Sequence, residues 1–230
     1  MIAQTNLQLY AQLRKAGQTQ DALAQVHAAY QFAAARCSPL FRGSGKPFSC
    51  HLVGVASLCA LLKCSADTLV AALLHASYQT RVSDTGIEPF ADLRRRYTSR
   101  FGLASERLVY GCYVASYDIN AHIEQPLPVP DLLTTEESSA VRLIVLADTL
   151  EDALDGGLAP HGNAGDSAEL RGSAAWRFAR MQAVRDVFLT EANALTCPQF
   201  ITLFDALLAE NAALLASGPF TGRYSSFRAS

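Results

Sequence analysis

Two histidines and one aspartate have surroundings in the sequence that suit metal chemistry. His51 directly follows the loop "SPLFRGSGKPFSC", and His75 ends the apolar segment "ADTLVAALLH". Asp148 lies within the apolar run "RLIVLADTLEDAL", where a buried carboxylate is costly unless it has a partner, and a cation is a suitable one. Two imidazoles and one carboxylate on three neighbouring helices predict a site for one divalent metal, either manganese, zinc or iron. A polar core network of the same side chains without an ion is the alternative.

A second group of polar residues is expected around the same cleft. Arg42 precedes a Ser-Gly loop, where a guanidinium can pair with a phosphate or stack on a base; an ordinary surface arginine is the alternative. Lys46, Gln79 and Arg81 are candidates to line this cleft. Glu151 and Asp152 are either pocket acids or the exposed face of a helix. The other histidines have no partner at a useful spacing and are interpreted as structural or surface residues: His27, His122 and His161.

The composition excludes several classes of protein. The chain has 230 residues, of which 50% are hydrophobic, so it can bury a substantial core. A net charge of −2 gives no reason to expect a nucleic-acid partner. No apolar run approaches the roughly 20 residues that span a bilayer, and the N-terminus lacks the order of a secretion signal. Six cysteines without a CxxC pair are typical of a reduced, cytoplasmic protein.

The hydrophobic periodicity is helical along almost the whole chain, and no strand is predicted. Helices are expected at residues 19–37, 50–63, 66–78, 90–101, 103–118, 134–155, 167–195 and 198–216. The proline-rich segment 124–133 is expected as an extended loop, and residues 156–167 as a linker. The prediction is an all-α protein with a single domain over residues 1–230. Its core covers residues 20–155, with C-terminal helices at 168–217 packed on it.

Three segments, in this order, resemble motifs of the HD-domain hydrolases: "FRGSGKPFSCH", "ADTLVAALLHA" and "LIVLADTLED". They are most similar to the RelA/SpoT-type hydrolase domain, which removes pyrophosphate from guanosine tetra- and pentaphosphate. The resemblance covers about residues 20–155 and implies an HD-domain-like helical bundle. It also implies that His51 is the first metal-binding histidine, that His75 belongs to the His-Asp pair and that Asp148 is the final ligand. Arg42 and Ser44 match loop positions that help to hold the nucleotide.

The chain departs from the family pattern at several positions. Ala76 replaces the aspartate of the His-Asp pair, and Gln79 and Thr80 replace the acidic pair used around the attacking water. Asp152 stands where the family has asparagine. Two histidines and one carboxylate can still hold a metal, but help from a general base is worth about 10²–10⁴-fold in rate. Hydrolysis by the family's usual mechanism is therefore expected to be impaired, with Gln79 and Asp152 as the remaining candidates for a catalytic role.

Three functions are compatible with these residues. The first is a degenerate HD-domain protein that keeps a cleft for a small molecule, nucleotide-like or phosphorylated, or that carries out a repurposed reaction. The second is an active metal-dependent phosphohydrolase that uses His51, His75 and Asp148, with Asp152 or a water as the fourth ligand. The third is a non-catalytic scaffold. Neither nucleic acid nor membrane is expected as a partner.

Overall fold

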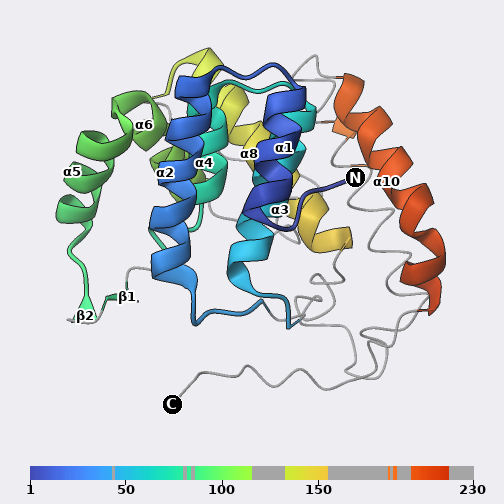
Figure 1. The fold of residues 1–230 in the computed structure, drawn as a ribbon, viewed down its shortest axis with the longest axis horizontal. Coiled ribbons are helices and arrows are strands. Elements are labelled where there is room, and N and C mark those ends of the chain that lie inside the picture. Colours follow the sequence, from blue (N-terminus) through green and yellow to red (C-terminus); the bar gives the residue numbers. More distant parts are fainter. Residues whose placement is uncertain are drawn as a thin grey trace. The chain divides into compact units, whose positions relative to one another are not determined.

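Helices make up most of the described residues in this structure, which is a computed structural model, and the fold is all-α as predicted (Figure 1). The structure describes residues 1–42, 45–79, 82–83, 86–115, 133–154, 186, 189–190 and 198–217. The chain divides into two compact units. The first unit comprises Met1–Leu40, Pro47–Ser116 and Pro128–Asp148, and the second comprises Phe41–Lys46, Tyr117–Leu127 and Thr149–Ser230. The predicted single domain stays a prediction.

The first unit contains most of the described helices. They are α1 (Asn6–Lys15), α2 (Gln20–Cys37), α3 (Phe48–Leu61), α4 (Ala66–Leu74), α5 (Phe90–Phe101) and α6 (Leu103–Val114). Helix α8 (Thr135–Leu154) begins in the first unit and ends in the second, and α10 (Pro198–Ser217) belongs to the second. The short antiparallel strands β1 (Val82–Ser83) and β2 (Gly86–Ile87) lie between the predicted helices 66–78 and 90–101, where no strand was predicted.

Local capping bonds explain where several helices begin. The side chain of Thr19 accepts a hydrogen bond from the backbone of Ala22 at the start of α2, and Ser65 caps α4 through Thr68 in the same way. Thr5 and Gln8 form a capping box at the start of α1, a helix additional to those predicted. Gly102, with φ of +88°, separates α5 from α6, because a positive φ is readily adopted only by glycine.

The core of the first unit is built around α3 and α4. Residues 51–60 of α3 are all buried, because this helix packs against α1, α2 and α4. Helix α4 packs in turn against α2, α3 and α6, and residues 68–74 of it are buried. Figure 1 shows α1, α2, α3 and α4 running alongside one another. This packing places His51, near the start of α3, and His75, just beyond the end of α4, in the interior.

The observed end of α4 differs from the predicted one. Helix α4 ends at Leu74 rather than at residue 78, because residues 75–79 form turns with shorter-range backbone bonds. Helix α10 matches the helix predicted at residues 198–216, and Phe200, Phe204 and Leu207 of it are buried. The predicted linker at 156–167, and nearly all of the predicted helix 167–195 and loop 124–133, lie outside the described residues. None of the described helices is both long and apolar enough to cross a lipid bilayer.

Candidate metal centre

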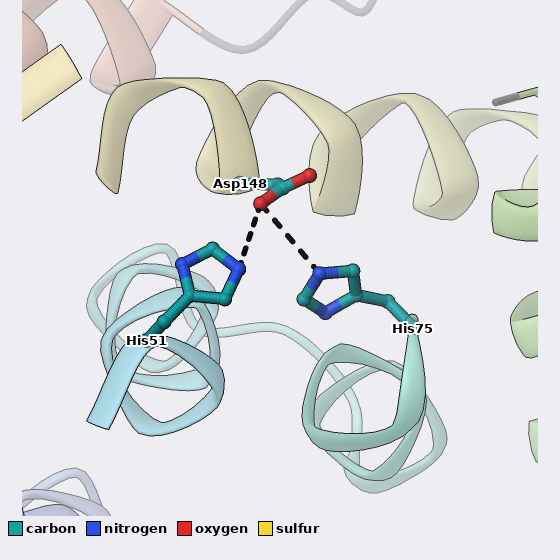
Figure 2. Close-up of side chains that lie close together, drawn as sticks. All are labelled: His51, His75 and Asp148. Carbon is teal, nitrogen blue, oxygen red and sulfur yellow. Dashed lines mark ion pairs between the residues drawn. The ribbon is translucent and has the colours of Figure 1, made fainter. Parts of the chain in front are cut away.

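Three segments of the first unit bring His51, His75 and Asp148 together (Figure 2). His51 lies in the first turn of α3, His75 is the residue that follows α4, and Asp148 lies in α8. The two imidazoles point at the same carboxylate from different helices (Figure 2). His51 is fully buried and the side chain of Asp148 is 14% exposed. The structure therefore places these three side chains together as one group that could hold a metal.

The spacing of the ligand atoms is tight. Nε2 of His51 lies 3.0 Å from Oδ1 of Asp148, and Nε2 of His75 lies 3.6 Å from the same oxygen. The three residues each offer one ligand atom, and these atoms all lie within 4.8 Å of one another. The imidazole rings meet edge to face, with their centroids 5.4 Å apart. All three side chains can thus contact one small ion at the same time.

These spacings fit a divalent ion. Bonds from zinc to histidine nitrogen or carboxylate oxygen are about 2.0–2.2 Å long. Two such ligands around one ion are about 3.0 Å apart at a right angle and about 3.4 Å apart at a tetrahedral angle. The separations of 3.0 and 3.6 Å are close to these values. The cluster is therefore a group of side chains that could hold a metal.

A hydrogen bond at its other ring nitrogen helps to orient the imidazole of His75. Nδ1 lies 2.7 Å from the carbonyl oxygen of Ala72 within the buried end of α4. A carbonyl can only accept a hydrogen bond, so Nδ1 carries the proton and donates it. In the neutral ring the lone pair is then on Nε2, which faces Asp148. Metal-binding histidines are typically held in this way, with the second nitrogen donating to a backbone carbonyl.

The carboxyl of Asp148 is held in its charged form. Burial alone raises its pKa, but the positive charge that His75 and His51 offer outweighs burial and lowers the pKa well below its usual value. Among the described residues, no hydrogen bond of good geometry reaches Oδ1, the oxygen that both imidazoles approach. A buried carboxylate oxygen in this situation needs positive charge, supplied either by protonated imidazole or by a cation.

Close packing of α6 and α8 helps to place Asp148. Val141, Ile144 and Val145 form a buried stripe along α8 that leads to Asp148 at helical spacing. Gly111 of α6 faces Val141, and a Cβ atom at position 111 would lie only 2.6 Å from Cγ2 of Val141. The absence of a side chain at residue 111 thus allows the two helices to approach closely.

The basic residues predicted to bind a ligand are matched by carboxylates in the second unit. Arg42 forms an ion pair with Asp152, and Lys46 forms one with Glu151. The amide of Arg42 also donates to the carbonyl of Lys46 over 2.8 Å, and the amide of Gly45 donates to the carbonyl of Arg42 over 2.9 Å. Gly45 has a φ of +85°, which accounts for glycine at this position. Ser44 lies outside the described residues.

The structure also shows where the departures from the family pattern lie. Ala76 is 4% exposed and offers no ligand atom. Gln79, a candidate for a catalytic role, is exposed at the end of the turn that follows α4. Asp152, the other candidate, forms the ion pair with Arg42. Thr80 lies outside the described residues.

Sequence reasoning missed a buried polar group beside the turn that carries His75. Tyr78 donates a hydrogen bond from its hydroxyl to Glu106, and Arg94 binds the same carboxylate. Glu106 is only 1% exposed. The available signal was a glutamate in the apolar segment "LASERLVYGCYV", where a buried carboxylate requires a partner.

No protein-family model matches the sequence of the chain, and no curated protein matches it.

Proposed function

We propose that this chain is a divalent-metal-binding protein with a degenerate HD-type centre, in which His51, His75 and Asp148 hold one ion of manganese, zinc or iron. The observation that carries the proposal is the approach of two imidazole nitrogens to one carboxylate oxygen, at 3.0 and 3.6 Å. Their order in the chain and the three motif-like segments support descent from an HD-domain hydrolase of the RelA/SpoT type.

Hydrolysis at this centre is impaired relative to such an ancestor. A bound divalent ion supplies Lewis acidity and lowers the pKa of water. The chain's own contribution is reduced, because Ala76 provides no fourth ligand and Gln79 provides an amide where a carboxylate would accept a proton. Losing general-base help typically costs about 10²–10⁴-fold in rate.

The ligand of the protein is a small, phosphorylated molecule, nucleotide-like in its chemistry. Arg42 and Lys46 are the residues that bind its anionic groups, through the guanidinium and the ammonium. Each is matched by a carboxylate, Asp152 or Glu151, so an anionic ligand replaces these carboxylates as it binds. We place the protein in the cytoplasm, because none of the five described cysteines forms a disulfide.

Metal analysis tests this proposal directly. The protein is purified without chelator, and bound metal is counted by mass spectrometry for the wild type, Asp148→Asn and the control His27→Gln. His27 hydrogen-bonds to Tyr10 and lies outside the cluster, so it controls for the loss of a histidine. We expect about one ion per chain in the wild type and the control, and almost none in Asp148→Asn, because an amide is a poor ligand.

If the protein loses its metal during purification, its stability in the presence of added zinc provides a second test. Zinc at about a hundredfold its dissociation constant should raise the free energy of unfolding of the wild type by about 2.7 kcal/mol, and that of Asp148→Asn by almost nothing. A wild type that neither retains metal nor gains stability from zinc or manganese overturns the proposal in favour of a metal-free polar network. Rapid release of pyrophosphate from guanosine tetraphosphate would instead show an active hydrolase.

A further inference from the structure

The segment that carries His75 lacks the backbone bonding of a regular helix on its C-terminal side. The amide of Ser77 donates to the carbonyl of Leu74 over 2.9 Å, and the amide of Gln79 donates to that of Ala76 over 3.0 Å. Both bonds span three residues, as in tight turns, rather than the four of an α-helix. The position of His75 therefore depends on how the side chains of residues 76–79 are held.

Tyr78 is the large side chain that anchors this turn. It is 1% exposed, and its ring contacts the aromatic rings of α5 and α6, with the Phe90 centroid 4.8 Å away and the Tyr113 centroid 5.7 Å away. Its hydroxyl donates a hydrogen bond of 2.7 Å to Oε1 of Glu106. Burial, followed by the bond to Glu106, raises the pKa of Tyr78, so the hydroxyl remains a donor.

Glu106 is itself held rigidly. Arg94 of α5 binds both carboxylate oxygens, with Nε 2.6 Å from Oε1 and one terminal nitrogen 2.8 Å from Oε2. The guanidinium of Arg94 also stacks over Tyr110 of α6, 4.3 Å from the ring centroid. Bidentate pairs of this kind restrict the carboxylate in distance and direction. The hydroxyl of Tyr78 thus has an acceptor that is attached to two helices.

We propose that Tyr78, through its hydrogen bond to the Arg94-bound carboxylate of Glu106, is a positioning residue that holds His75 in the orientation needed for metal binding. His75 is fixed on one side by Nδ1 bonding to Ala72 and on the other by the anchored turn. The inference rests on the proposed metal function and names residues of the chain that support it. Tyr78 acts through the backbone of the turn rather than by touching the ion.

The decisive variant is Tyr78→Phe, which keeps the buried ring and removes only the hydroxyl. Glu106 keeps both bonds from Arg94, so the variant is expected to fold. Tyr10→Phe is the matched control, because it removes a hydroxyl bonded to His27 on α1 and α2, away from the turn. Leu13→Val is a second control that destabilises the fully buried core position of α1 without touching the turn.

Two readouts separate positioning from simple loss of stability. In calorimetric zinc titrations, Tyr78→Phe should bind about tenfold more weakly than the wild type, the lower end of the effect of outer partners of metal ligands. In NMR spectra of the metal-free protein, the Nδ1 proton of His75, which is bonded to Ala72, should exchange slowly with solvent in the wild type and faster in Tyr78→Phe. Both controls should match the wild type in both readouts.

The outcomes distinguish this inference from the proposed function. If the wild type binds no zinc, the proposed function fails, and the NMR readout still decides whether Tyr78 orients His75. Unchanged His75 signals in Tyr78→Phe overturn the inference, and so do equal changes in Leu13→Val. Glu106→Gln, which keeps an acceptor oxygen for Tyr78, should disturb His75 less than Glu106→Ala; the reverse order would contradict the role assigned to the carboxylate.

Discussion

Nε2 of His51 and Oδ1 of Asp148 lie 3.0 Å apart in the interior of the first unit and join α3 to α8. The same oxygen faces the Nε2 atom of His75, whose opposite nitrogen donates to a backbone carbonyl. A buried carboxylate approached by two imidazoles is stable only when positive charge is present, as protons or as a cation. This relationship makes the metal content of the protein the first property to measure.

Restoring the missing acid tests how Ala76 relates to the centre. Ala76→Asp introduces a carboxylate at a position that is 4% exposed, next to His75. Without metal, we expect the free energy of unfolding at pH 7 to fall by about 3 kcal/mol or more, because a charge is buried. Zinc should recover this loss and bind at least about tenfold more tightly than to the wild type.

The matched control for this substitution is Ala76→Asn, which has nearly the same size but offers no charged ligand. It should be destabilised without being rescued by zinc. If zinc rescues neither variant, residue 76 does not face the centre, and the alignment of this turn with the His-Asp pair is incorrect.

Stability at acid pH should depend on Glu137, which lies in the first turn of α8. Arg107 binds its carboxylate with contacts of 2.5 and 2.8 Å, and the amide of Thr134 donates to it over 2.8 Å. These partners, Arg107 first, lower the pKa of Glu137 to about 2 against the smaller opposing effect of burial. Because the folded pKa is depressed, the stabilisation is complete above the unfolded value of about 4.3 and is lost as the pH falls toward 2.

Urea denaturation of the wild type and Glu137→Gln at several pH values measures this effect. The difference in free energy of unfolding should be constant from pH 7 to pH 5.5 and should shrink steadily between about pH 4.5 and pH 2. Glu136→Gln, an exposed neighbour in the same turn, is the control and should show little difference at any pH. A Glu137→Gln difference that does not change with pH would contradict the assignment.

The contact between α6 and α8 predicts that Gly111→Ala is destabilising. The added Cβ would lie 2.6 Å from Cγ2 of Val141 and 2.9 Å from Cδ1 of Leu133. Overpacking of this kind lowers the free energy of unfolding by about 1–3 kcal/mol. This loss should exceed the gain of up to about 1 kcal/mol that alanine brings through its better helix propensity. Because α8 carries Asp148, the same variant should bind zinc more weakly than the wild type.

Ala104→Gly is the control, because residue 104 is exposed on α6 and the change alters helix propensity alone. It should lower the free energy of unfolding by about 1 kcal/mol and leave the affinity for zinc unchanged. Thermal denaturation and zinc titration of the two variants give the comparison. A Gly111→Ala protein more stable than the wild type would show that the side chains of Val141 and Leu133 move aside without lowering the free energy of unfolding.

Much of the secondary structure and the membership of the candidate site could be predicted from the sequence. Thr19, Ser65 and Gly102 mark helix ends through local bonds or local backbone preference, which depend on a few neighbouring residues. His51 and His75 were identified because each adjoins an apolar helix, and the structure places both beside Asp148. Occupancy by a metal stays a prediction.

Only the tertiary structure decided which partners the charged and buried polar groups take. Arg42 and Lys46 meet Asp152 and Glu151, and Tyr78 meets Glu106 with Arg94, although each group is assembled from segments distant in the chain. Helical periodicity and capping extend over about four residues, so they specify which face of a helix is apolar but not which charge lies opposite it. That choice depends on how closely helices pack, as Gly111 allows α6 and α8 to do, and packing is a property of the folded chain.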